Sequence, residues 1–107
     1  QVLAASVKMV QKQITIDTIK EAVCGYYGLD TSRLLERTRK REVVVARQMS
    51  MYLAKKYTSL SLAGIGDVLG KKDHATVLHA CKTITEQIGV DKKLRSDLEE
   101  IEQRIQG

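Results

Sequence analysis

A short polar run in the second half of the chain carries the donors and acceptors that base recognition in DNA requires. Directly after Gly70 the sequence reads Lys71-Lys72-Asp73-His74-Ala75-Thr76. An ionised aspartate such as Asp73 only accepts hydrogen bonds, as a cytosine amino group requires, whereas Thr76 both donates and accepts. A capping aspartate on an ordinary hydrated helix gives the same pattern, so the run by itself only nominates candidates.

Two helices joined by a tight turn are predicted to position this run. Ser61 is a good N-cap for the first helix, and Gly70 suits the position after its last residue. Asp73 can cap a second helix that continues until Gly89. This is a helix-turn-helix pattern, in which the first turns of the second helix enter the DNA major groove.

Helical periodicity divides the second helix into two faces. The apolar stripe, which should face a core, consists of Val77, Cys81, Ile84 and Ile88. The outer face consists of Ala75, Thr76, His79, Lys82 and Thr83. His74 falls in line with the apolar stripe, so it either packs inward or points at bases from the first turn.

A longer helix is predicted from Glu42 to Tyr57. Its core stripe consists of Ala46, Met49, Leu53 and Tyr57, and its opposite face of Arg47, Gln48, Met51 and Lys55. An arginine can bind guanine or phosphate through two N–H groups, and a glutamine can donate to a phosphate oxygen. Taken alone, this is an ordinary hydrated helix face.

A basic loop, Arg37-Thr38-Arg39-Lys40-Arg41, precedes that helix. The net charge is +5, and residues 36–82 hold ten basic and four acidic side chains. Clustered cations gain affinity for DNA by releasing counterions, and an arginine can enter a narrow minor groove. A merely solvated basic loop is the alternative.

The rest of the chain is predicted to form the packing scaffold of an all-α domain. Among 107 residues, 43% of them hydrophobic, there is no Phe, Trp or Pro and no convincing alternating strand. A helix from Thr18 to Tyr27 should be capped by Thr15 or Asp17 and ended by Gly28, and a short helix should follow. That short helix is capped by Asp30 or Thr31 and runs through Leu34 and Leu35. A last helix, Asp91 to Ile105, has a stripe of Leu94, Leu98, Ile101 and Ile105 that could pack against the domain or against a partner.

Cys24 and Cys81 form neither a disulfide framework nor a zinc site, and we expect them to be small core residues.

Several segments resemble the C-terminal DNA-binding domain of the bacterial replication initiator family DnaA. They are Ala46-Arg47-Gln48, Ser61-Leu62, Ile65-Gly66 and Lys72-Asp73-His74-Ala75-Thr76-Val77-Leu78-His79-Ala80. The likeness spans roughly Ile14 to Ile88. The family usually has Ser, Thr or Pro at the position of Ala75, so one hydroxyl contact is missing, although alanine can still touch a thymine methyl group.

The resemblance implies a compact, Trp-repressor-like helix-turn-helix domain in residues 14–107. Residues 1–13 would be the end of a linker helix from an upstream ATPase module, so ATP would bind outside this chain. No catalytic residue, metal or cofactor is expected in the chain itself. The implied partner is double-stranded DNA, in the form of DnaA boxes (TTATNCACA in the family) at the replication origin. We expect a cytoplasmic, nucleoid-associated bacterial protein with no membrane contact by this domain, which should be monomeric in isolation.

The resemblance also assigns roles to individual residues. Asp73, His74 and Thr76 would read bases in the major groove, and Ala75 would add an apolar contact. Arg39 would enter the minor groove. The residues implied to hold the DNA backbone are Arg47, Gln48, Lys55 and Lys72. Lys82, on the outer face of the second helix, is a further candidate for DNA binding through phosphate.

Two other classes of function fit the residues less well. A transcription regulator with the same motif would usually dimerise, and only the last helix is available as a dimer seam. An enzyme is disfavoured because no phosphate-cradling loop or paired-carboxylate cleft is visible, and because His74 and His79 are not spaced as an i, i+4 metal pair. Single-strand or RNA binding lacks the aromatic side chains for a stacking platform.

Overall fold

The computed structural model describes residues 14–70 and 73–106, and within these ranges it contains helices and no strand. In chain order these are α2 (Ile16–Tyr27), the short 3₁₀ helix η1 (Thr31–Leu35), α3 (Arg41–Tyr57), α4 (Leu62–Val68), α5 (His74–Ile88) and α6 (Lys92–Gln106). The all-α prediction is confirmed. The linker helix predicted for residues 1–13 lies outside the described residues.

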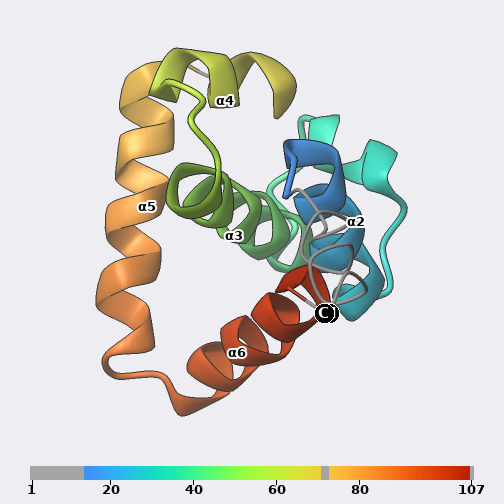
Figure 1. The fold of residues 1–107 in the computed structure, drawn as a ribbon, viewed down its shortest axis with the longest axis vertical. Helices are drawn as coiled ribbons and strands as arrows, with labels where there is room; N and C mark the ends of the chain where they lie inside the picture. Colours follow the sequence, from blue (N-terminus) through green and yellow to red (C-terminus); the bar gives the residue numbers. More distant parts are fainter. Residues whose placement is uncertain (1–13, 71–72, 107) are drawn as a thin grey trace, which may run out of the picture.

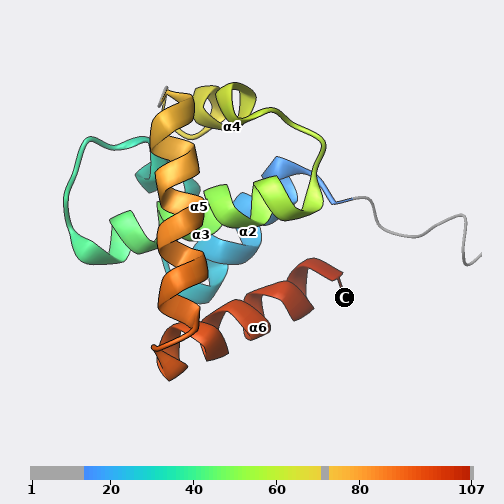
Figure 2. The ribbon, with the colours of Figure 1, turned by 90° about the vertical axis from the view of Figure 1, so that its left-hand side faces the viewer.

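Helix α3 lies at the centre of the fold, and most other elements are arranged around it. Figure 1 looks nearly along α3, with α5 on one side and α2 on the other. Figure 2 shows α5 crossing α3. Helix α3 contacts α2, η1, α4 and α5, while α6 packs against α2 and α5. Helix α6 therefore packs across the side of the domain formed by α2 and α5.

The predicted apolar stripes form the core or pack against it, but α3 buries apolar residues outside its predicted stripe. Fully buried side chains include Ile19, Val23, Leu34, Met49, Leu53, Ile65, Val77, Ile101 and Ile105. Met51, predicted on the outer face of α3, is only 1% exposed and belongs to the same core. The reason is that α3 has neighbours on several sides, so it buries more than the single stripe of an amphipathic surface helix.

The helix ends follow the predicted capping chemistry. Thr15 rather than Asp17 caps α2, and its Oγ1 accepts a hydrogen bond from the Thr18 amide at 3.2 Å. The helix therefore begins at Ile16, two residues earlier than predicted. Gly28 ends it with φ of 70°, a left-handed conformation that favours glycine.

None of the helices in the described part of the chain is both long and apolar enough to cross a membrane.

Helix α6 is fastened to α2 by a buried carboxylate as well as by its apolar stripe. Asp97 is 4% exposed and accepts hydrogen bonds from the hydroxyls of Tyr26 at 2.5 Å and Tyr27 at 3.2 Å. It also forms an ion pair with Lys93 at 2.9 Å. Burial alone would raise the pKa of Asp97, but these hydrogen bonds outweigh it and lower the pKa below its ordinary value.

Replacing Asp97 with Asn should weaken the domain in a pH-dependent way. A carboxylate with a lowered pKa stabilises the fold above its unfolded pKa, and this contribution is lost as the pH falls through the folded pKa. At pH 7 we expect Asp97→Asn to reduce the free energy of unfolding by about 1–3 kcal/mol. The difference from wild type should shrink below pH 4, which is near the ordinary pKa of an aspartate. Urea unfolding followed by circular dichroism at both pH values measures this. An equal loss at both would mean that only packing is affected.

Candidate nucleic-acid interface

Helices α4 and α5 form the predicted helix-turn-helix. Ser61 caps α4, and its Oγ accepts from the Gly64 amide at 3.0 Å. Gly70 follows the last turn of α4 with φ of 100°, a conformation that side chains rarely adopt. Glycine is therefore the residue that suits this turn after α4.

The first turn of α5 is solvent-exposed, as base reading would need. Asp73 is the N-cap, and its Oδ1 accepts from the Thr76 amide at 2.9 Å. Asp73, His74, Ala75 and Thr76 are all exposed. His74 therefore does not pack inward, because contact with the core begins only at Val77, one turn further along the helix.

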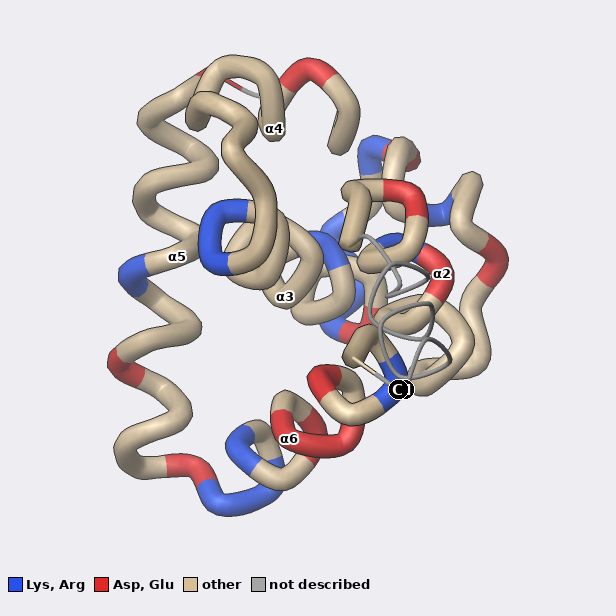
Figure 3. Tube along the Cα trace, viewed as in Figure 1, with Lys and Arg blue, Asp and Glu red and all other residues tan. Residues whose placement is uncertain are grey.

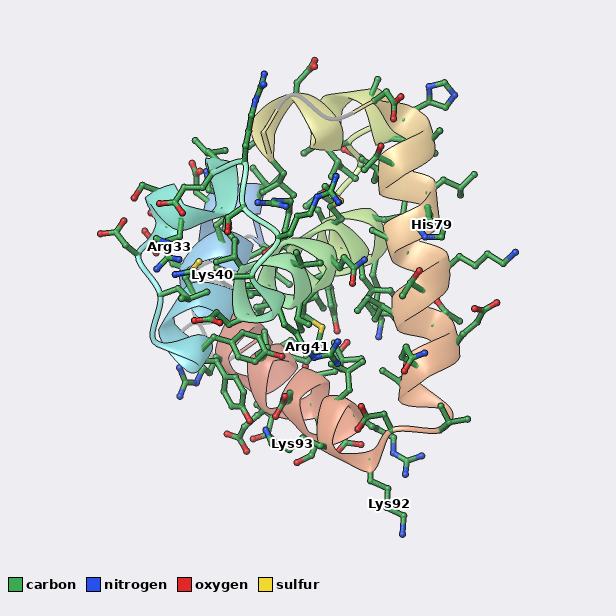
Figure 4. The ribbon with its side chains drawn as sticks, turned by 180° about the vertical axis from the view of Figure 1, so that it is seen from behind. Arg33, Lys40, Arg41, His79, Lys92 and Lys93 are labelled. Atoms are coloured by element: carbon green, nitrogen blue, oxygen red, sulfur yellow. The ribbon has the colours of Figure 1, made fainter. Side chains whose placement is uncertain are left out.

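The two predicted faces of α5 are present. Val77, Ala80 and Ile84 are buried, and Cys81 and Ile88 are half-buried beside them. On the outer face Ala75, His79 and Lys82 are exposed, and Thr83 is half-buried. Figure 4 shows His79 on α5, on the side of the molecule away from Arg33 and Lys40. The exposed strip thus continues from the first turn along the helix.

Arg47 does not lie on a hydrated face of α3, and that part of the prediction is wrong. The side chain is buried, with Nε donating to the Leu34 carbonyl at 2.8 Å and Nη2 donating to the Glu36 carbonyl at 2.5 Å. Burial lowers the pKa of Arg47, and the Glu36 carboxylate opposes this effect. Arg47 is turned toward η1 because unpaired carbonyls at the end of that helix attract a cation.

The other candidates on α3 and α5 lie at different depths. Gln48 is half-buried and lines a groove between α3 and α5 together with Thr83 and Ile84. Lys55 is exposed near the end of α3, where it partly offsets the rise that burial causes in the pKa of the Cys81 thiol. Lys72 lies outside the described residues. Figure 3 shows a basic segment at the end of α3, and both basic and acidic segments on α5 and α6.

The basic loop and the helix-turn-helix line the same hollow. Arg37, Arg39 and Lys40 are exposed on the loop between η1 and α3. A cavity of about 860 Å³ is lined from the loop and α3 by Leu35, Arg37, Thr38, Arg39, Val44 and Arg47, and from the other side by Asp67, Val68 and Gly70. Sequence reasoning gave no role to Asp67, since nothing in the sequence indicates that it faces the loop.

Metal-ligating side chains do not gather in the described part of the chain. It contains no group of three or more His, Cys, Asp or Glu side chains placed to hold a metal ion. Cys24 is a buried free thiol and Cys81 a partly buried one, as expected of core residues.

Comparison with known proteins identifies the family. Residues 16–84 match the family described as bacterial dnaA protein helix-turn-helix. The chromosomal replication initiator protein DnaA of Bacteroides thetaiotaomicron is 53% identical over 91 residues, which cover 85% of this chain and 19% of that protein. The protein of the same name from Flavobacterium psychrophilum is 45% identical over 105 residues, covering 98% of this chain and 22% of that protein.

This chain therefore spans about a fifth of the length of these relatives. The family match covers more than half of the chain, and the similarity to the relatives extends over most of it. The chain belongs to the bacterial DnaA family and is its helix-turn-helix, DNA-binding domain.

Proposed function

We propose that this domain recognises double-stranded DnaA boxes of the TTATNCACA type and so docks the initiator at the replication origin. The observation that carries the proposal is the exposed first turn of α5, with Asp73, His74 and Thr76 pointing away from the core. Gly70, which borders the hollow that the basic loop lines, stands three residues before the Asp73 cap of α5. Two neighbouring elements thus offer base-reading and cationic groups.

In this proposal α5 reads the major groove. Hydrogen bonds from the Thr76 side chain and backbone lower the pKa of Asp73, so the group is an ionised acceptor at neutral pH. Its Oδ1 caps the helix, and a carboxylate has a second oxygen that can accept from a cytosine amino group. Thr76 and His74 add hydrogen-bonding groups, and Ala75 presents a methyl group to thymine.

Arg39 enters the minor groove, and other residues hold the backbone. Arg39 is exposed on the loop before α3, at a distance along the chain from the helix that enters the major groove. The backbone contacts are Gln48, Lys55, Lys82 and, outside the described residues, Lys72. These contacts position the protein on the duplex without reading its sequence.

The rest of the initiator's activity belongs to parts that this chain does not span. We propose that ATP binds to an upstream module and that the isolated domain is a monomer of the bacterial cytoplasm, associated with the nucleoid. A fluorescence anisotropy titration of one box duplex and one scrambled duplex at the same salt concentration tests the central claim. The box should bind more tightly by a factor of at least ten, and equal affinities would refute sequence-specific recognition.

Binding should depend strongly on salt, and Lys55 should account for part of that dependence. Arg39, Lys55, Lys72 and Lys82 together neutralise about four phosphates, which gives a slope of log K against log salt of about −4. Lys55→Ala should weaken binding to box and scrambled DNA alike and reduce the slope by about one. Lys92→Ala is the matched control, since Lys92 is an exposed lysine on α6 (Figure 4). An unchanged slope in Lys55→Ala would remove Lys55 from the interface.

Thr76→Val should reduce box binding selectively. The substitution keeps the shape of the side chain and removes its hydroxyl, so affinity for the box should fall by about 1–3 kcal/mol while scrambled DNA is hardly affected. Thr85→Val, at an exposed threonine later on α5, is the matched control and should change neither. Equal losses on both duplexes would make Thr76 a positioning contact. Asp73→Asn, which retains a capping oxygen, should likewise lose affinity for the box alone.

Arg39 should discriminate base pairs through the minor groove. A G·C pair places an amino group there that obstructs an arginine, whereas an I·C pair resembles A·T in this groove. Substituting I·C for A·T at the Arg39 end of the box should therefore be tolerated, and G·C should cost about 1–3 kcal/mol. Arg39→Ala should abolish the difference, and Arg95→Ala on α6 should keep it. If wild-type protein binds the I·C and G·C duplexes equally, Arg39 contacts only phosphate.

A further inference from the structure

Arg47 differs from the other cations near the hollow in how its guanidinium is used. It is 9% exposed, whereas Arg37, Arg39 and Lys40 are exposed. Its Nε and Nη2 both donate to backbone carbonyls, those of Leu34 and Glu36. We infer that Arg47 is a positioning residue that fixes the basic loop, and with it Arg39, relative to α3. This rests on the proposed function of Arg39.

The two carbonyls that Arg47 binds mark the point where η1 passes into the loop. Leu34 is fully buried in the core, and Glu36 is the C-cap of η1. Carbonyls at the end of a helix lack partners within that helix and carry partial negative charge. A charge buried at this depth is tolerated when such acceptors satisfy it. Arg47 therefore fastens the start of the loop to the middle of α3.

The other end of the loop is fixed by α3 itself. The Lys40 carbonyl accepts from the amides of Val43 at 3.1 Å and Val44 at 2.9 Å. Only Arg37, Thr38 and Arg39 lie between the two anchored residues, Glu36 and Lys40. A span this short, held at both ends, leaves Arg39 a narrow range of positions. Within it, the Lys40 amide donates to Thr38 Oγ1 at 3.2 Å.

The anchor also relates the loop to the helix-turn-helix. Helix α3, which carries Arg47, packs directly against both α4 and α5. The positions of the loop and of α5 are thus both set by their contacts with α3. Arg47 consequently sets the distance between the proposed minor-groove arginine and the proposed major-groove residues, on which simultaneous entry into two grooves depends.

A lysine substitution separates positioning from phosphate binding. Lysine keeps the charge, but a single ammonium cannot reproduce the planar fork that reaches two carbonyls. If Arg47 contacted phosphate, Arg47→Lys would keep most of the affinity and the salt slope. If Arg47 is a positioning residue, Arg47→Lys should lose its function as fully as Arg47→Met does. Arg95→Lys makes the same change at an exposed arginine on α6, outside the proposed interface, and serves as the matched control.

The first measurement is minor-groove discrimination by the whole chain. Wild type and Arg95→Lys should prefer the I·C box over the G·C box by about tenfold. In Arg47→Lys the ratio should fall to about one, as in Arg39→Ala, and the double variant should lose no more than either single variant. A preserved ratio in Arg47→Lys, or a double variant with additive losses, would overturn the inference.

The second measurement needs no DNA. Backbone ¹⁵N relaxation in the free protein should give lower order parameters for residues 37–39 in Arg47→Lys than in wild type, with residues of α3 and α5 unchanged. Equal order parameters would overturn the positioning role. Failure of the proposed function would instead appear as equal affinity of wild type for box and scrambled DNA, whatever the loop dynamics.

Discussion

The burial of α3 among four other elements is the constraint on which the rest of the structure depends. Val43, Ala46, Met49, Met51 and Leu53 are all at most 1% exposed on this one helix. Burying apolar area contributes about 25 cal/mol per Å², so a helix enclosed in this way holds its neighbours in place strongly. Because α2, η1, α4 and α5 all contact α3, their mutual positions are set through it.

This arrangement explains how a small domain can present both the helix-turn-helix and the second element proposed to bind DNA. Helix α5 buries one side of its length and leaves its first turn exposed, with the Asp73 cap closing the helix end. The basic loop connects η1 to the first turn of α3. The loop is held at both ends, by Arg47 and by the first turn of α3, and α5 is held by its buried face.

The opposite end of the fold is stabilised by different chemistry. Asp97 draws Tyr26, Tyr27 and Lys93 together between α2 and α6, and Glu102 pairs with Lys56 at 2.6 Å and accepts from the Tyr57 hydroxyl at 2.8 Å. These carboxylates satisfy polar groups around the docked terminal helix. They lie away from the first turn of α5, and so the acidic side chains do not repel DNA at the proposed interface.

The sequence by itself determined the helices, several of their caps and the polar first turn of α5. Each of these depends on residues within about four positions of one another, as in the Asp73 cap, the Ser61 cap and the left-handed Gly28. Tertiary structure alone decided the roles of Arg47 and Met51 and the meeting of Arg39 and Asp67 at one hollow. The physical reason is that periodicity identifies the buried stripe of a helix that has one neighbour. A helix with neighbours on several sides buries further residues, and distant segments that local spacing does not specify decide which ones.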